Sequence, residues 1–337
     1  MKLKVVAIDL AKQVFALYGR DGHDKVRLRE KVRRESLRAK LRQIEPTLVV
    51  MEACGGAHFW AQEFEKMGHT VRMIAPQYVK PYVKTNKNDF NDAEGICEAA
   101  LRPNMRFVAR KSVEQLEMQA VHRVHAQYSK QRTALANEMR GILTEFGVIL
   151  PLGINKVRTQ VGDVLEDAEN GVPDLVRNLI GQLRDRLREL DASLLQQEKL
   201  LKQLYQNNEL CQRAGQLPGV GVMTATAVVA AGGDLKQFRN GRGFAAWLGL
   251  VPRQHSSGGK TVLQGISKRG NCYLRKLLVH GARSLVRVAD KKTDARNLWI
   301  QSLKQRRGYC RTTVAVANKQ ARMLWVLLAR GESYKPM

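Results

Sequence analysis

The chain has 337 residues, with 57 Lys and Arg against 31 Asp and Glu, which gives a formal net charge of +26. This length suggests two or three domains, and 44% hydrophobic residues are enough to build folded cores. No apolar run is long enough to span a membrane and no signal-peptide pattern is present, so we expect a cytoplasmic protein without a membrane partner. Its five scattered cysteines form no Cys-x-x-Cys pair, which argues against a disulfide framework or a zinc site.

The positive charge is concentrated in the last third of the chain. Residues 235–337 hold 22 Lys and Arg but three acids. This bias favours a polyanion as partner, and nucleic acid first, because its phosphates can neutralise many fixed positive charges. Charge alone does not distinguish DNA from RNA, and an ordinary solvated basic surface is the plainer interpretation.

Residues 2–110 alternate between strand and helix patterns, which predicts a mixed α/β domain with a covered sheet. Strands are expected at residues 4–9, 14–18, 25–32, 47–52 and 70–74. Helices are expected at residues 36–44, 58–67 and 89–101.

The middle of the chain predicts two long helices. The first extends from Ser112 to about Phe146, and a connection rich in Pro and Gly follows it. The second has strict four-three spacing of apolar residues, broken only by Gln197, at positions 176, 180, 183, 187, 190, 194, 201 and 204. This is the a/d pattern of a coiled coil, so we expect two antiparallel helices, paired within the chain or with a second protomer.

The remainder is expected to be mainly helical. An Ala- and Val-rich helix follows Leu217–Gly221, and further helices are predicted at residues 273–288 and 313–328, with a glycine-rich basic stretch at 251–271. The expected domains are therefore 1–111 (α/β), 112–208 (helical coiled coil) and 209–337 (basic and mainly α-helical).

Four acids stand where metal ligands are often found. Asp9 and Glu52 each end an apolar strand, and Asp89 and Asp92 share one face at the start of a helix. Carboxylates from two strands and a helix can hold two Mg²⁺ ions, which would assist attack at a phosphodiester. Taken singly, Asp92 can be an ordinary helix-start carboxylate, and Glu52 can be a buried acid with a local partner.

The segments that carry these acids resemble the DEDD domain of the IS110 family of insertion-sequence transposases, which includes the pilin-gene inversion recombinases. The similar segments are Ile8–Lys12, Met51–Gly55 and Asn86–Ala93. The resemblance implies a RuvC-like domain with a ribonuclease H fold, in which these four acids are the catalytic residues and metal ligands.

The basic stretch contains two serines, Ser256 and Ser257, directly before two glycines. Glycines let the backbone approach a ligand closely, and a serine in positive surroundings can attack a phosphate. A flexible basic loop is the plainer interpretation. A P-loop is excluded because Gln254 stands where that motif needs glycine, and nothing marks an acid that would orient His255 in a protease-like site.

The family resemblance extends into this region. Second-domain motifs of the family match Pro218–Gly221, Gly249–Pro252, Ser257–Gly258 and Ser267–Asn271. In the family, the serine before glycine is the nucleophile that joins covalently to DNA. The resemblance therefore implies that Ser257 is catalytic, with Ser256 as the fallback, and that a C-terminal transposase domain completes the chain.

Further residues are candidates for nucleic-acid contact. Leu217–Gly221 before a helix resembles a helix-hairpin-helix turn, whose backbone N–H groups can hold a phosphate, although a plain connecting turn is equally compatible. The predicted nucleic-acid-binding residues are Gly219, Gly221, Arg253, Lys260, Lys268, Arg269 and Arg275.

Other residue types are assigned structural roles. His122 and His125 lie one helical turn apart and are interpreted as a surface pair rather than metal ligands. Trp247, Trp299 and Trp325 stand in apolar helical contexts and are expected in the core rather than stacked on bases.

The resemblance implies a Mg²⁺-dependent DNA recombinase, the transposase of a bacterial insertion sequence, acting on double-stranded DNA at the element ends and the target. It also implies a dimer or tetramer and, for some members, a non-coding bridge RNA that guides DNA choice by base pairing. Such an enzyme would lie in the bacterial cytoplasm, associated with the nucleoid. Two alternatives stay open: a RuvC-like metal-dependent junction nuclease, which would not need Ser257, and a non-catalytic nucleic-acid-binding protein.

Overall fold

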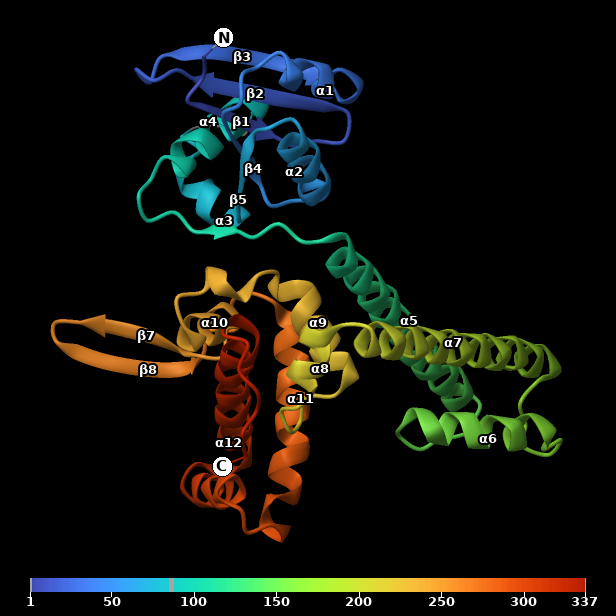
Figure 1. The fold of residues 1–337 in the computed structure, drawn as a ribbon. Coiled ribbons are helices and arrows are strands. Elements are labelled where there is room, and N and C mark those ends of the chain that lie inside the picture. The colour runs from blue at the N-terminus through green and yellow to red at the C-terminus, as the bar shows by residue number, and fades with distance from the viewer. Residues whose placement is uncertain (1, 85–87, 337) are drawn as a thin grey trace. The chain divides into compact units, whose positions relative to one another are not determined.

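The computed structural model describes residues 2–84 and 88–336. The chain divides into two compact units, Met1–Ser112 and Val113–Met337. The first is mixed α/β and the second is almost entirely helical (Figure 1). The predicted succession of an α/β domain and a mainly helical region is confirmed, while the three-part division at residues 111 and 208 stays a prediction.

A six-stranded sheet in the order β3-β2-β1-β4-β5-β6 forms the centre of the first unit. Strands β1, β4 and β5 are parallel, whereas β2, β3 and β6 each pair antiparallel with their neighbours. The strands are β1 (Val5–Asp9), β2 (Val14–Arg20), β3 (Val26–Arg33), β4 (Leu48–Glu52), β5 (Thr70–Ile74) and β6 (Phe107–Val108).

Helices cover both faces of this sheet (Figure 1). On one face, α1 (Arg34–Arg42) and α2 (Ala57–Lys66) pack in a cluster that includes Phe15, Leu41 and Trp60. On the other, α3 (Pro76–Val79), a short 3-10 turn and α4 (Asp89–Ala100) pack on Val5, Ala7 and Val50. Because both faces are covered, the central strands are apolar at consecutive positions, and that run of apolar residues made them predictable.

Two 33-residue helices, α5 (Val113–Glu145) and α7 (Asp174–Gln206), begin the second unit. Their antiparallel pairing follows from two contacts, Arg132 with Asp191 and His125 with Glu198. Seam residues of α7, including Ile180 and Leu187, are buried against α5.

A third helix, α6 (Ile154–Glu166), packs beside this pair through Val157 and Val161, which are fully buried. The sequence predicted only a connection here, and that prediction is wrong. Pro151 and Gly153 punctuate the start of the segment, and its apolar stripe is too short to outweigh them.

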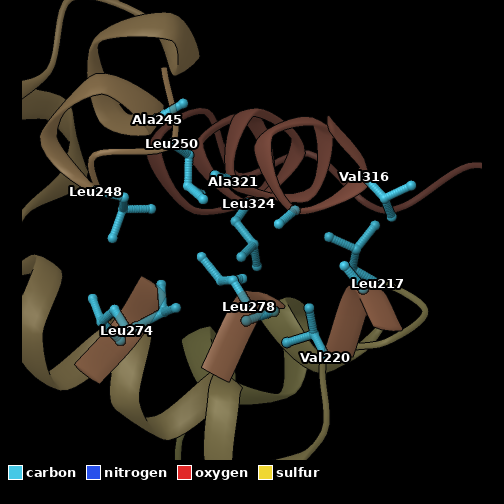
Figure 2. Packing of buried hydrophobic residues seen from close by; sticks show 14 of the residues in the cluster. Leu217, Val220, Ala245, Leu248, Leu250, Leu274, Leu278, Val316, Ala321 and Leu324 are labelled. Atoms are coloured by element: carbon cyan, nitrogen blue, oxygen red, sulfur yellow. The ribbon is translucent and has the colours of Figure 1, made fainter. Parts of the chain in front are cut away.

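The C-terminal helices enclose the largest core of the second unit. They are α8 (Glu209–Gly215), α9 (Val222–Gly232), α10 (Gly241–Trp247), α11 (Cys272–Val288) and α12 (Ala295–Ala329), with 3-10 turns at Leu235–Gln237 and Ala289–Lys291. Figure 2 shows Leu278 and Leu324 facing each other in this core, with Leu274 and Leu217 on either side of them. Helix α12 is broken at Gly308 and starts 18 residues earlier than predicted, because its first half is mostly polar.

Strands β7 (Pro252–Ser257) and β8 (Lys260–Ile266) form a two-stranded hairpin in the second unit. None of the helices in the described residues combines the length and the apolar character that crossing a membrane requires.

Candidate active site

Asp9 and Glu52 lie next to each other at the carboxyl ends of two parallel strands. β1 and β4 are paired in register up to the residues directly before these acids. Ala7 and Val50, two positions earlier on each strand, belong to the cluster on the α4 side of the sheet. Because side chains alternate across a strand, both carboxylates point toward that same side, where they are half-buried.

Helix α4 carries the other two acids on the face that packs against the sheet. Ala93 and Ile96 are buried against the strands, and Asp89 and Asp92 stand four residues before them, so they continue the same stripe by one turn. The Asn88 side chain caps the helix by accepting a hydrogen bond from a backbone N–H of the first turn. Carboxylates in the first turn are favoured by the positive end of the helix dipole.

Lys31, which no sequence motif marks, binds one of these acids. Its Nζ lies 2.7 Å from Oδ2 of Asp89. In the sheet, Asp9 is opposite Ala16 of β2, and Ala16 is opposite Lys31 of β3, so Lys31 and Asp9 lie in one row on one face. Only the pairing of β2 with β3 reveals this placement, which no local motif indicates.

The four acids are not gathered into one ligand set. Over residues 2–84 and 88–336, no group of three or more His, Cys, Asp or Glu side chains lies close enough to hold a metal ion. The structure brings Asp9 and Glu52 together at the strand ends, and it brings Asp89 to Lys31. Two further residues of the motif, Asn86 and Lys87, lie outside the described residues.

The Cys54 thiol lies close enough to the strand ends to be influenced by their charge. Burial raises its pKa above the usual value, and the negative charges of Glu52 and Asp9 raise it further. The thiol is therefore neutral at physiological pH and a poor nucleophile, since the thiolate is the reactive form.

Ser257 lies at the tip of the hairpin formed by β7 and β8. It is opposite Lys260, and the two strands are joined by Gly258 and Gly259, whose φ angles are +54° and +77°. Two successive positive φ angles are typical of a tight type I′ hairpin turn, which glycine adopts without strain. All residues of both strands are exposed except Ile266, which is half-buried. The sequence left open that this segment is a flexible basic loop, and in the structure it is a β-hairpin.

Ser256 and Ser257 point to opposite faces of this hairpin, because they are adjacent in one strand. The Ser256 hydroxyl accepts a hydrogen bond of 2.8 Å from Nε2 of Gln254. Ser257 shares its face with Lys260, directly opposite. The acids thus belong to the first unit of the chain and both serines to the second.

Comparison with known proteins identifies the family. A DEDD transposase model of the IS110 group matches residues 6–148, and a model described as "Transposase IS116/IS110/IS902 family" matches residues 211–297. The chain is also 49% identical to a "Probable family 20 transposase" of Pseudomonas aeruginosa, over the full length of both proteins. The chain belongs to the IS110 family of transposases. The resemblance found in the sequence motifs is confirmed.

Other relatives support the same assignment over both units of this transposase. It is 45% identical to the transposase for insertion sequence element IS1111A of Coxiella burnetii, over 99% of this chain and 92% of the relative. It is 38% identical to the transposase for insertion sequence element IS1328 of Yersinia enterocolitica, over 97% of each. The chain is therefore an enzyme, an insertion-sequence transposase, which disfavours the non-catalytic alternative.

The basic candidate residues of the transposase fall into two groups. Four are exposed on the hairpin or just after it: Arg253, Lys260, Lys268 and Arg269. Arg275 differs because its guanidinium donates hydrogen bonds of 2.9 Å to the backbone oxygens of Leu248 and Arg269. These bonds hold the segment after the hairpin against α10, so Arg275 has a structural role, and its contact with nucleic acid stays a prediction.

The two glycines of the turn before α9 have different surroundings. Gly219 is in close backbone contact with Gly281 of α11, where a Cβ on Gly281 would come within 2.0 Å of the Gly219 oxygen. The Gln320 side chain also donates a 2.9 Å hydrogen bond to the Pro218 oxygen of the same turn. Gly221, in contrast, is exposed at the start of α9 with open space beside it. The Gly221 end of the turn is therefore open, and contact of Gly219 and Gly221 with nucleic acid stays a prediction.

His122 is a buried junction of three helices, so its interpretation as a surface residue is wrong. It is 4% exposed, and its two ring nitrogens lie 3.0 Å from the Tyr273 hydroxyl and 2.9 Å from Thr226 Oγ1. Burial lowers the pKa of His122 to about 4. Both partners are more than 100 positions away in the chain, so no local pattern could have revealed them.

Proposed function

We propose that this transposase cuts and rejoins double-stranded DNA at its element ends and target through Mg²⁺-assisted attack by Ser257. The observation that carries the proposal is the register of β1 and β4, which sets Asp9 and Glu52 next to each other on the face covered by α4. Ligands of open α/β sheets bind beyond the carboxyl ends of such strands. The second candidate function is a metal-dependent junction nuclease, which would need these acids but not Ser257.

Asp9 and Glu52 would hold magnesium at the strand ends, and Asp89 and Asp92 would have to move toward them to complete the ligand set, since carboxylate oxygens are the donors that this cation prefers. When bound, the ion would stabilise negative charge that develops on the phosphate oxygens. Asp89 can join the other acids once its ion pair with Lys31 opens. The released Lys31 ammonium is then available to a DNA phosphate, in the same row of the sheet as Asp9.

Ser257 would supply the nucleophile. Its Oγ forms a bond to phosphorus while the bond from phosphorus to one strand oxygen breaks; the serine hydroxyl loses its proton and the departing oxygen gains one. The phosphoserine conserves the bond energy, so the hydroxyl of a second strand can reverse the step without ATP. An exposed hairpin tip leaves Ser257 open to a large substrate, and the candidate basic residues around it, with Gly219 and Gly221, would bind the DNA backbone.

We further infer that the first unit has a RuvC-like ribonuclease H fold. Its parallel β1 and β4, flanked by the antiparallel β2 and β3, support this inference. The antiparallel pairing of α5 and α7 along an a/d seam supports a coiled coil at 112–208, between catalytic domains at 1–111 and 209–337.

The partners follow from the same proposal. The proposed partners are double-stranded DNA and a guide RNA, and the net charge of +26 is compatible with both. A homo-oligomer, a dimer or a tetramer, would let acids and serines of different protomers take part in one reaction. We place the enzyme in the bacterial cytoplasm, with the nucleoid.

A covalent-trapping assay tests the serine mechanism. Purified transposase is mixed with Mg²⁺, labelled DNA spanning the element junction, and RNA that copurifies with the protein, resynthesised from its sequence. Wild type and Ser256→Ala should give a protein–DNA adduct on denaturing gels, and Ser257→Ala should give none. Cleavage without an adduct would favour the nuclease, and an adduct lost only in Ser256→Ala would make Ser256 the nucleophile.

A further inference from the structure

A large groove runs along the C-terminal half of α12, in the second unit. It has a volume of about 1070 Å³ and is lined by α10, α12 and residues 330–335. Two of its lining residues are in close contact: Gly241, the first residue of α10, packs on the Arg322 backbone with no room for a side chain between them. The groove is therefore built from closely packed helices.

The lining of this groove is strongly basic. Among the described residues of the lining, Glu332 is the one acid. Five side chains are cationic: Arg242, Lys319, Arg322, Arg330 and Lys335. Glu332 lies 3.7 Å from Arg330, which leaves the excess charge on the others. Arg242 and Arg322 are both exposed. A concentration of positive charge in a concave surface attracts a polyanion.

Aromatic rings line the same groove. Tyr334 is half-buried on its wall, and so is Trp299, which was predicted to lie in the core and is only partly buried there. The Lys319 ammonium lies 4.3 Å from the centre of the Trp299 ring, so it covers one face of this ring, and a base that stacks there would displace it. Trp325 is 7% exposed, and its indole N–H donates to the backbone oxygens of Leu235 and Phe238, so it belongs to the core.

We propose that this groove binds one single strand of nucleic acid, apart from the hairpin that carries Ser257. Single-strand sites combine a basic groove along the backbone with aromatic rings on which bases stack, and both features are present here. A concave groove of this volume accepts a few nucleotides, whereas a duplex presents a convex surface that would lie across its mouth. This inference rests on the proposed function in one respect, namely that the partner is a nucleic acid. It does not depend on attack by Ser257.

The test is equilibrium binding by fluorescence anisotropy, with the full chain carrying Ser257→Ala and without Mg²⁺, so that failure of the serine mechanism does not affect it. The probes are labelled oligothymidylate and oligouridylate of about 16 nucleotides, the upper end of single-strand site sizes, and a duplex of equal length. The test variant is Arg242→Ala with Arg322→Ala. The matched control is Arg186→Ala with Arg188→Ala, which removes two exposed arginines from α7.

We expect the groove variant to bind the single strands roughly tenfold more weakly than the control. Two lost phosphate contacts should also reduce the slope of log affinity against log salt by about 1.4. Equal slopes in the groove and control variants would overturn the proposal, as would an equal loss for the duplex. Preference for one of the two strands would identify DNA or RNA as the source.

The aromatic contribution is tested at Trp299. Trp299→Ala should weaken single-strand binding at least about fivefold, and Trp299→Phe should restore most of the affinity, because a phenyl ring still stacks on a base. Thermal unfolding of both variants separates stacking from lost packing. If Trp299→Phe binds as weakly as Trp299→Ala while remaining folded, stacking in the groove is wrong.

Discussion

The acids and the serine of this transposase lie in contrasting structural settings, a buried sheet and an exposed hairpin. Asp9 and Glu52 follow strand residues that are fully buried between two helical layers, such as Ile8 and Met51. Ser257 lies on a two-stranded hairpin with both faces exposed, and such a hairpin alone is at best marginally stable in water. The difference teaches that the carboxylates are positioned by the fold itself, whereas the position of the serine depends on what the hairpin touches.

Neutralising the acids should give the largest effect. Asp9→Asn or Glu52→Gln keeps the shape of the side chain, so the fold should persist while DNA cleavage and joining fall by at least about 10³-fold. Cleavage of labelled element DNA and thermal unfolding measure the two quantities. Unchanged activity in a folded variant would show that the strand ends are not the catalytic site.

Next in size is a change within the core of the second unit. Leu278 is fully buried in the cluster of Figure 2, so Leu278→Ala should lower the free energy of unfolding by about 2–5 kcal/mol. Urea denaturation measures this loss. A loss below about 1 kcal/mol would mean that the helices around Leu278 close the cavity by moving together.

His122 should make the stability of the same core depend on pH. Its pKa is about 4 in the folded protein and about 6.5 in the unfolded chain, so the unfolded state binds the proton more readily. Above pH 6.5 His122 is mostly neutral in both states, so the difference in pKa hardly changes the free energy of unfolding. As the pH is lowered from 6.5 toward 4, the free energy of unfolding falls, by about 2 kcal/mol at pH 5.

The variant His122→Gln isolates this effect, because glutamine does not titrate. Between pH 7.5 and 5 its unfolding free energy should fall less steeply than that of wild type. His58 in the first unit, whose pKa is also lowered to about 4, is present in both proteins and cancels in the comparison. Parallel curves for the two proteins would show that His122 is not the group responsible.

The smallest effect is expected on the hairpin. Leu263 of β8 is 63% exposed, so Leu263→Ala should change the free energy of unfolding by less than about 0.5 kcal/mol. The same urea experiment as for Leu278 gives a direct contrast between leucines of one unit. A loss above about 1 kcal/mol would show that the hairpin packs against the protein, which would remove the difference between the two settings.

The sequence was most informative in the first unit. The five strands and three helices expected there are present within two residues of their predicted bounds. Covered strands carry apolar runs, and the acids that end two of those runs, Asp9 and Glu52, stand out for that reason. The parallel pairing that makes these two acids neighbours connects residues 43 positions apart, such as Ile8 and Met51, and had to come from the structure.

The second unit was less predictable, for several physical reasons. The hairpin has no apolar face, so Arg253–Ser257 resembled a loop, although two glycines between strand-forming residues are a hairpin signal. The first half of α12 is mostly polar, and the contacts of His122 join distant segments. The groove on α12 combines residues that begin at Asn240 and end at Lys335, and no motif connects them.

The alternation of side chains along β1 links the direction of Asp9 to correct folding of the first unit. Val5, Ala7 and Asp9 share one face of the strand, so the register that buries two apolar residues also directs the acid. A slip of one residue would turn Asp9 to the opposite face and at the same moment expose the core. A misregistered first unit would thus be unstable as well as inactive, and the cell's proteases would remove it before it could hold DNA ends without joining them.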